Sequence, residues 1–455
     1  VITDMGNPAF YKGYLETDLK RQTGNVPRSV MRVMNVQEAR DTWGERVKAL
    51  DVAKKAAKAA REKLGLGELP EEGEKPADPA PEQQPVVDAA QRQKTVCVTG
   101  ASGYLGSVIV SRLVEQAGYS VRGSVRDLAK WQAHPFFAGL GQKVTLFQAD
   151  LTGSQELFAK EFKWCQFVIH SASPYLATPT NPQNQIVDPT VAGINTVLGA
   201  ARTAGVSRVV VTSSTGTITP QRPQPIHRGK LFTEDDWQRD ATVQDGPNKL
   251  AKKLVEDAIW AFSKEPGTNV EFAVINPSFI IGPPVIPRTD GVSLGFLKAA
   301  LEGEYRDGAP GKASGVADVR DVADVHIAAM TAVAAPGSRF IVSSTASFTK
   351  LDLLNLLKAD TQKRFEKFQQ QLPSKMVTEA DFKPLYSVTR AKTILNLNFI
   401  PAQQSMLDMA EYFLTNNLVS SAGDTAKEAA LTALHTDTDA MFKEMVSLGI
   451  ATEGQ

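Results

Sequence analysis

Short apolar runs alternate with amphipathic stretches through the middle of the chain. The runs are rich in Val, Ile and Phe and are too short for buried helices, so they predict buried strands. Six such runs occur, at residues 95–98, 119–125, 144–148, 167–170, 209–211 and 272–275. Between them apolar residues recur at helical spacing. This alternation predicts an α/β fold, with a Rossmann-type doubly wound parallel sheet in a domain at 93–275.

The chain beyond this domain predicts further helices. Residues 276–420 predict a smaller C-terminal substrate lobe that returns elements to the sheet. Within it, 318–330 reads as a helix that Asp321 would cap, and 351–357 as an amphipathic core helix. Residues 421–455 keep helical apolar spacing and predict a helical extension.

The region before the domain has a different character. Residues 1–34 lack periodicity and predict an extended arm, whereas 35–64 carry a heptad-like seam with a basic outer face. Residues 1–66 thus predict an arm and an amphipathic helix. This helix either lies on the globular domain of the same chain, with its outer face in solvent, or docks on another protein. Residues 67–92 are rich in Pro and Glu and predict a linker. Segments 1–66 and 421–455 are the predicted surfaces for protein partners.

Composition and charge exclude several classes. Lys plus Arg and Asp plus Glu each total 50, so nothing pulls the chain toward nucleic acid. No apolar run is long enough for a transmembrane segment. Cys97 and Cys165 lie in apolar runs and predict buried free thiols, and the five scattered histidines predict no metal site. The chain begins at Val1, so the alternatives are an organellar protein (mitochondrion or chloroplast) after leader removal or a cytoplasmic one.

A glycine-rich turn follows the first predicted strand. Gly100, Gly103 and Gly106 have the spacing GxxGxxG and precede a predicted helix. A strand, a glycine turn and a helix form the context of a dinucleotide site, because the backbone must approach a pyrophosphate at the helix N-terminus. The alternative is a glycine turn with no ligand, and the surrounding pattern favours the dinucleotide.

Two further strand ends suggest which dinucleotide is bound. Arg126 follows the second strand, where an acidic residue would accept hydrogen bonds from the ribose hydroxyls of NAD(H). An arginine suits the 2′-phosphate of NADP(H), unless it is only a surface residue beside Asp127. Asp150 follows the third strand and either accepts from the adenine amino group or stabilises a turn.

Together these motifs identify a known family. The chain resembles extended short-chain dehydrogenases/reductases of the NAD-dependent epimerase/dehydratase superfamily. It is most similar to the branch of dihydroflavonol reductase, cinnamoyl-CoA reductase and yeast methylglyoxal reductase. The resemblance covers residues 94–418 and rests on the segments 100–106, 124–127, 170–174, 211–214, 234–237, 276–277, 281–283, 318–323, 339–343 and 396–399 and on His326.

The resemblance implies hydride transfer from NADPH to a carbonyl. A serine orients the carbonyl, a tyrosine donates the proton, and a lysine four residues later binds the nicotinamide ribose. Ser214 matches the serine, with Ser213 and Thr215 as alternatives, and Lys252 matches the lysine. The predicted coenzyme-binding residues are Gly100, Ser102, Gly103, Tyr104, Leu105, Gly106, Arg126, Asp150, Leu151, Ser171, Ala172, Ser173, Lys252, Pro277 and Ser278.

The tyrosine of this pattern is absent. Alignment on Glu256 and Trp260 places Asn248 at the tyrosine position and Ala251 at the serine before Lys252. An asparagine amide does not ionise usefully at neutral pH, so it can donate a hydrogen bond but not a proton. Loss of the acid typically reduces the rate by about 10²–10⁴-fold.

Two hypotheses follow. In the first, the chain is an NADP(H)-binding reductase-fold protein of weak or no activity, an accessory or structural subunit of a larger complex that is either organellar or cytoplasmic. In the second, it is an active NADPH-dependent reductase of ketones or aldehydes that uses another donor, such as water relayed by Thr217 or Asn248. The added segments and the missing acid favour the first. The cleft loops of this fold vary, so the sequence names no substrate.

Overall fold

The computed structural model describes residues 91–92, 94–174, 179–380 and 382–419. The chain divides into two compact units, Val1–Val86 and Val87–Gln455, and the described residues all belong to the second. The predicted arm and helix of residues 1–66, almost all of the predicted linker and the predicted extension at 421–455 therefore lie outside the described residues.

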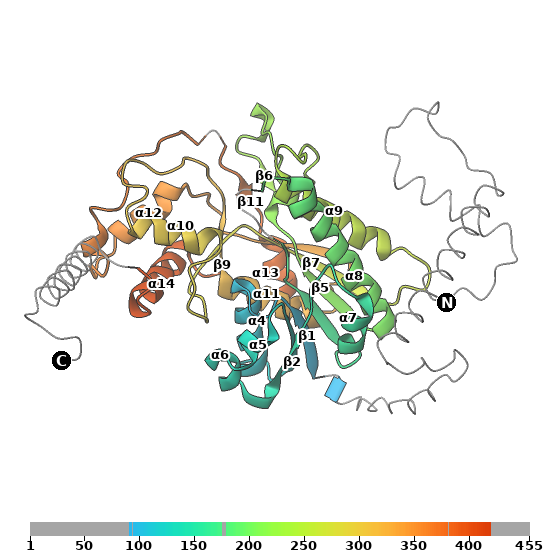
Figure 1. Cartoon of the computed structure of the whole chain (residues 1–455). Coiled ribbons are helices and arrows are strands. Elements are labelled where there is room, and N and C mark those ends of the chain that lie inside the picture. Colours follow the sequence, from blue (N-terminus) through green and yellow to red (C-terminus); the bar gives the residue numbers. More distant parts are fainter. Residues whose placement is uncertain (1–90, 93, 175–178, 381, 420–455) are drawn as a thin grey trace, which may run out of the picture. The chain divides into compact units, whose positions relative to one another are not determined.

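A seven-stranded parallel sheet forms the centre of this unit (Figure 1). Its strand order is β10-β7-β5-β4-β1-β2-β3, which places the topological switch between β1 and β4. The strands are β1 (Thr95–Thr99), β2 (Ser120–Val125), β3 (Val144–Gln148), β4 (Phe167–His170), β5 (Arg208–Thr212), β7 (Glu271–Pro277) and β10 (Ser338–Val342). The predicted doubly wound fold is confirmed, and all six predicted strands are present. The seventh, β10, comes from the region predicted as the second lobe and pairs with β7 at the edge of the sheet.

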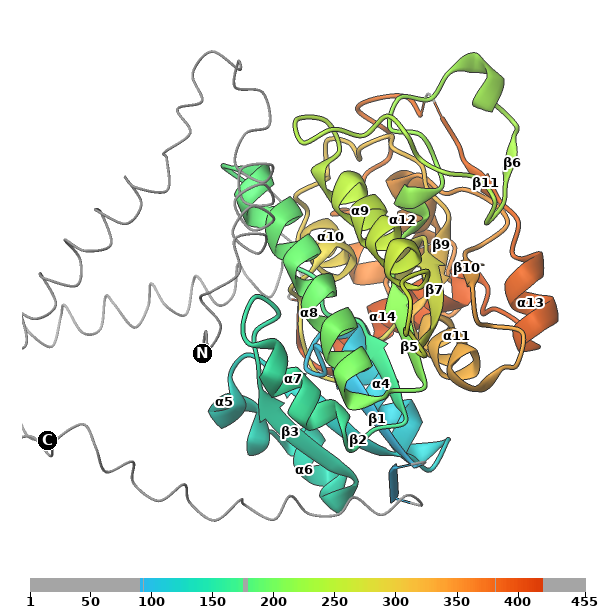
Figure 2. The same ribbon diagram turned by 90° about the vertical axis from the view of Figure 1, so that its right-hand side faces the viewer.

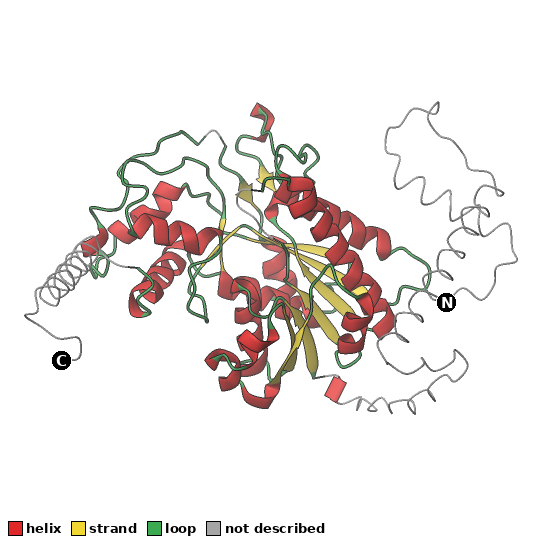
Figure 3. Ribbon diagram, in the orientation of Figure 1, coloured by secondary structure: helices red, strands yellow, loops and turns green. Residues whose placement is uncertain are grey.

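Helices cover both faces of the sheet (Figure 2, and by element type in Figure 3). One face packs against a core shared by α4 and α11, and the other against a core shared by α7, α8 and α9. Cys97 and Cys165 are buried free thiols in the second core, as predicted. The helices with their bounds are α4 (Tyr104–Glu115), α5 (Leu128–Gln132), α6 (Pro135–Gly139), α7 (Gln155–Phe162), α8 (Asp188–Ala204), α9 (Pro247–Phe262) and α11 (Val319–Thr331).

The second lobe has a core of its own. Apolar side chains from α10, α12 and α14 bury one another there, and the predicted core helix at 351–357 lies within α12. The elements of this part are α10 (Val292–Leu301), α12 (Lys350–Lys358), α13 (Thr389–Leu395), α14 (Ala402–Thr415) and the paired short strands β8 (Phe279–Ile281) with β9 (Val316–Asp318) and β6 (Leu231–Phe232) with β11 (Leu385–Tyr386). No helix in the described ranges is long and apolar enough to cross a membrane.

The predicted capping residue of α11 was wrong. Asp318, the last residue of β9, caps the helix by accepting from the backbone N–H of Arg320 at 2.8 Å. Asp321 lies within the first turn, and its carboxylate accepts from the backbone N–H of Ile400 at 2.7 Å. Burial raises the pKa of Asp321 to about 7. Asp321 therefore ties α11 to the chain before α14, a contact that sequence spacing does not reveal.

Candidate active site

The glycine turn between β1 and α4 is tightly closed. The Gly103 N–H donates to the Gly100 carbonyl at 2.9 Å, and Gly100 has a φ of +70°, which favours glycine. A Cβ on Gly106 would lie 2.1 Å from the Gly100 carbonyl oxygen. Any side chain at Gly106 would therefore push α4 away from the turn.

We expect Gly106→Ala to lower the free energy of unfolding by about 1–3 kcal/mol, because a methyl group cannot enter a packed contact without a backbone shift. The same shift should weaken dinucleotide binding at the turn. Gly139→Ala is the matched control, since nothing lies within 4 Å of a Cβ there. Urea unfolding of both variants measures the difference, and equal stability would show that α4 adjusts freely.

The N-terminus of α4 is open to an anion. Its N-cap is Gly103, no side chain caps it, and the first turn holds no acidic residue. Free N–H groups and the helix dipole at such a terminus bind phosphate groups. Tyr104 contributes only its backbone here, because its hydroxyl donates to the Gly282 carbonyl at 2.6 Å and burial raises its pKa well above the usual value.

Arg288 reaches the same turn from the second lobe. Its guanidinium donates to the Ser102 carbonyl at 2.8 Å and forms a two-pronged ion pair with Asp290. Arg288 was not predicted from the sequence, because it is 186 residues from Ser102 in the chain and belongs to no motif. This contact places a positive charge beside the predicted pyrophosphate site.

The residues predicted to select the coenzyme lie at the ends of β2 and β3. Arg126 is exposed, and no hydrogen bond or ion pair ties it to another residue in the described ranges, while Asp127 caps α5 by accepting from the Lys130 N–H at 2.9 Å. Asp150 forms the predicted turn: one carboxylate oxygen accepts from the N–H and hydroxyl of Thr152 at 2.8 and 2.6 Å. These hydrogen bonds lower the pKa of Asp150. Its other oxygen takes no part in this turn.

The end of β4 is held to β1 by side-chain hydrogen bonds. The Ser171 hydroxyl donates to the Thr99 carbonyl at 2.7 Å, and the Thr99 hydroxyl lies 2.8 Å from Nδ1 of His170. Burial lowers the pKa of His170 to about 3, so its ring is neutral. The Ser171 side chain is therefore structural, and the exposed Ser173 presents its hydroxyl more freely. Directly after β7, the Ser278 N–H donates to the Val342 carbonyl at 3.0 Å.

Three neighbouring hydroxyl residues follow β5, and their surroundings differ. Ser213 is 3% exposed and donates to the Glu256 carboxylate, and Thr215 is 7% exposed. Ser214 is only half-buried, and its hydroxyl accepts from the Gly216 N–H at 3.0 Å at the start of a short 3-10 helix. Of the three hydroxyls, that of Ser214 is therefore the best placed to reach a ligand.

Asn248 and Lys252 lie four residues apart near the start of α9, and so share one face of the helix. The Lys252 ammonium donates to the Thr212 carbonyl at 2.8 Å at the end of β5, and burial lowers its pKa to about 8. Asn248 is half-buried. Tyr386, which packs against Thr215 from the second lobe, is 3% exposed, and burial raises its pKa. The described part of the chain thus places no exposed phenol beside Ser214.

Comparison with known proteins identifies the family. A model of the NAD dependent epimerase/dehydratase family matches residues 96–342. The chain belongs to this family. It is 30% identical to cinnamoyl-CoA reductase CAD2 of Medicago truncatula, over 70% of this chain and 94% of that protein. With cinnamoyl-CoA reductase 1 of Arabidopsis thaliana the identity is 33%, over 71% and 90%. The predicted resemblance is confirmed.

Solved structures of the family agree with the fold. The yeast methylglyoxal/isovaleraldehyde reductase Gre2, solved in complex with NADPH, matches 71% of this chain and 99% of its own, with a TM-score of 0.63 and 25% identity. The Gre2 complex from Candida albicans matches with a TM-score of 0.62 and 24% identity, a likeness that shows the fold alone. This family member therefore shares its sheet and both helical layers with reductases.

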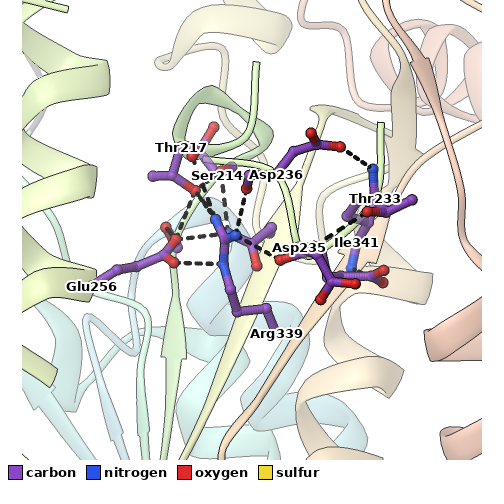
Figure 4. Close-up of polar contacts among 11 residues, drawn as sticks. Ser214, Thr217, Thr233, Asp235, Asp236, Glu256, Arg339 and Ile341 are labelled. Atoms are coloured by element: carbon purple, nitrogen blue, oxygen red, sulfur yellow. Dashed lines mark hydrogen bonds and ion pairs between the residues drawn. The ribbon is translucent and has the colours of Figure 1, made fainter. Parts of the chain in front are cut away.

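A buried ion pair lies beneath the turn that carries Ser214 (Figure 4). One Glu256 oxygen accepts from the Thr217 hydroxyl and the Asn276 amide, each at 2.7 Å, and from the Ser213 hydroxyl. The other lies 2.7 Å from Nε of Arg339 in β10. This network joins β5, α9, β7 and β10 below the candidate site, and its members Ser213, Asn276 and Arg339 lie in segments that carried the family resemblance.

Arg339 also contacts the segment before α9. It donates to the Glu234 and Asp236 carbonyls, each at 2.8 Å, and its guanidinium lies 3.9 Å over the Trp237 ring.

A buried hydrogen bond joins His326 to Thr212. Because Nδ1 of His326 must donate to the Val322 carbonyl, its Nε2 accepts from the Thr212 hydroxyl at 2.7 Å. Burial lowers the pKa of His326 to about 4, so the ring is neutral and structural.

Proposed function

We propose that this protein binds NADP(H) at the β1–α4 turn and reduces carbonyl compounds weakly or not at all. The observation that carries this proposal is Asn248, which stands on α9 four residues before Lys252, where the family pattern has its tyrosine. The proposed coenzyme binding is supported by the uncapped α4 terminus and by the close contact of Gly106 with the Gly100 carbonyl, where a Cβ would collide.

The bound coenzyme would supply the hydride. Within the chain, Ser214 would orient the carbonyl by hydrogen bonding, and the Lys252 ammonium would bind the ribose hydroxyls. Asn248 would donate a hydrogen bond to the carbonyl oxygen, but its amide cannot transfer a proton at neutral pH. Binding should therefore persist while turnover is about 10²–10⁴-fold below that of an enzyme with the acid in place.

The alternative is an active NADPH-dependent ketone or aldehyde reductase with a substitute donor. A relay through Thr217 is not favoured, because this residue is fully buried and its hydroxyl is bonded to Glu256. A water held by Asn248 remains as the donor of this alternative. Assaying the unaltered protein with NADPH and simple aldehydes tests both: turnover at ordinary enzyme rates would contradict the weak-activity proposal.

Arg126 provides the test of coenzyme choice. We expect Arg126→Ala to weaken NADPH binding by roughly ten- to a hundredfold and NADH binding hardly at all, since a charge-assisted bond to a 2′-phosphate is lost. Lys143→Ala is the control, because Lys143 precedes β3 at the opposite end of the sheet from Arg126. Fluorescence titration with each coenzyme measures the effect. Equal losses for NADPH and NADH would contradict the phosphate role.

The proposal extends to an accessory or structural role in a larger complex, either organellar or cytoplasmic. It is supported by segments 1–66 and 421–455, which lie outside the matched family region and carry the predicted helices. These segments would bind other proteins, whereas the described unit would bind the coenzyme and a small carbonyl compound. The native mass of the protein from its source tests this role. A species of 49.2 kDa alone would contradict it.

A further inference from the structure

Three lysines that the predicted mechanism does not use lie on α9, beside the turn that carries Ser214, and in two bridged segments of the second lobe. Lys249 follows Asn248 on α9, and its Cγ lies 3.0 Å from the place of a Cβ on Gly216, beside the Ser214 hydroxyl. Its ammonium donates to the Pro220 carbonyl at 2.9 Å. Lys249 therefore extends along the turn that carries Ser214.

Lys350 approaches from the second lobe, at the start of α12. Its ammonium lies 3.1 Å over the ring of Phe279, two residues after Pro277 at the end of β7, and 4.2 Å over the ring of Phe296 in α10. The lysine is half-buried, and within the described ranges no hydrogen bond or ion pair uses its ammonium. Burial, and then the charge of Lys312, lower the pKa of Lys350 to about 7.

Lys312 is the third lysine, and it is related to both Lys350 and Lys249. Ser314 and Phe348 exchange backbone hydrogen bonds of 3.0 and 2.8 Å in an antiparallel bridge, which brings together the two segments that carry Lys312 and Lys350. Burial and the charge of Lys312 also lower the pKa of Lys249, to about 8. The charge of Lys312 thus disfavours the charged form of both other lysines.

The acidic groups nearby are already engaged. The charges of Asp240 and Asp245 favour the charged form of Lys249. The Asp240 carboxylate, however, already accepts hydrogen bonds from the backbone N–H groups of Gln221 and Arg222. The Asp245 carboxylate accepts hydrogen bonds from the side chains of the same two residues. The groups that face Lys350 from neighbouring elements are the Phe279 and Phe296 rings and Lys312, and Asp352 of its own helix caps the Thr349 N–H.

We infer that Lys249, Lys312 and Lys350 form an anion subsite beside Ser214, and that the ligand of the candidate site is a small carbonyl compound carrying a negatively charged group such as a carboxylate. Lys249 and Lys350 are half-buried and Lys312 is exposed, and an anion that enters between them favours the charged form of each ammonium group. A carboxylate would give each of them a charge-assisted hydrogen bond. The inference rests on the proposed function for the position of the carbonyl, but binding of the anion requires no turnover.

Two compounds of matched shape test this subsite. 4-Phenyl-2-oxobutanoate and 4-phenyl-2-butanone share the ring and the ketone, and the first adds a carboxylate. By calorimetry on the full chain at pH 7 and low salt, we expect the oxoacid to bind at least about tenfold more tightly. Equal affinities would overturn the inference.

Variants then separate the lysines from general charge. Lys350→Met and Lys312→Met should each weaken oxoacid binding by roughly tenfold and leave the ketone unchanged. Lys253→Met is the control, because Lys253 lies on the same helix as Lys249 but pairs with Asp257. Lys312 is exposed, so its variant should fold normally even where Lys350→Met does not. Unchanged oxoacid affinity in Lys312→Met would contradict its place in the subsite.

Proton uptake gives a second readout. A bound carboxylate stabilises the charged form of Lys350 and raises its pKa, so binding at pH 8 should take up protons, measured as a dependence of the heat on buffer ionisation enthalpy. Lys350→Met should reduce this uptake, which a merely structural lysine would not alter. NADPH affinity is measured separately. Normal NADPH binding without a preference for the oxoacid would refute the anion subsite alone. A preference for the oxoacid without NADPH binding would refute only the proposed coenzyme site.

Discussion

A Glu256→Leu variant is expected to lose about 3–5 kcal/mol of its free energy of unfolding, because it leaves the buried Arg339 guanidinium without its counter-charge. Glu256 is fully buried and Arg339 is 4% exposed. The hydroxyls of Ser213 and Thr217 and the Asn276 amide lose the same acceptor, and buried donors left unpaired are costly. Urea unfolding followed by circular dichroism measures the change.

Matched variants show whether the loss comes from the buried pair. Glu265→Ala removes an exposed ion pair with Arg202 and should change stability by no more than about 1 kcal/mol. Glu256→Gln keeps the shape without the charge and serves if the leucine variant does not fold. The double variant Glu256→Leu with Arg339→Met should be less destabilised than the sum of the two single changes. Additive effects would show that the two side chains do not stabilise each other.

The position of this pair explains why it matters for the site. Ser213 and Thr217 flank Ser214 along the chain, and both bond to Glu256 from below. The turn is therefore fixed on its buried side, while the Ser214 hydroxyl stays at the surface. Loosening the pair should displace Ser214 before it affects the β1–α4 turn, which belongs to a different core. We expect carbonyl ligands to lose affinity first.

Local patterns predicted the sheet and the glycine turn well, because both depend on residues close in sequence. A buried strand needs a short apolar run, and the closure of Gly103 on Gly100 needs only adjacent residues. The same holds for the free thiols Cys97 and Cys165, which lie in apolar strand sequences.

Contacts between distant segments could not be predicted in this way. By their position in the sequence, Asp318 and Asp321 could each cap α11. The structure shows that Asp318 caps the helix, whereas Asp321 accepts from the backbone N–H of Ile400. Arg288 reaches the coenzyme turn because the second lobe folds over it. Likewise the lysines of the anion subsite come from three separate segments, and no motif joins them.

The two halves of the candidate site therefore differ in what they retain. The coenzyme half keeps the turn, the uncapped helix and a free arginine at Arg126. The carbonyl half keeps Ser214 and Lys252 but has an amide at the acid position. A fold that keeps the first half can bind a dinucleotide without turnover, so coenzyme affinity alone does not separate an enzyme from a binding subunit.

Restoring the proton donor at position 248 distinguishes an enzyme from a binding subunit directly. Asn248→Tyr combined with Ala251→Ser is expected to raise NADPH-dependent reduction of simple carbonyls by about 10²–10⁴-fold, because a phenol beside the Lys252 ammonium can donate a proton. Asn248 is half-buried in the first turn of α9. Ala251 is 2% exposed, so Asn248→Tyr alone is the second variant if the added hydroxyl disturbs packing. Loss of NADPH absorbance at 340 nm measures the rate.

The control is Asn248→Phe with Ala251→Ser, which adds the same ring without the hydroxyl and should show no gain. Adding Lys252→Met to the tyrosine variant should abolish the gain, because the ammonium no longer lowers the pKa of the phenol. NADPH affinity in the tyrosine variant should equal that of the unaltered chain, since neither changed residue lies at the β1–α4 turn. If the tyrosine variant binds NADPH normally and stays inactive toward aldehydes, ketones and the oxoacid, the carbonyl half has diverged beyond the loss of one proton donor. A single side chain would then not account for the missing activity.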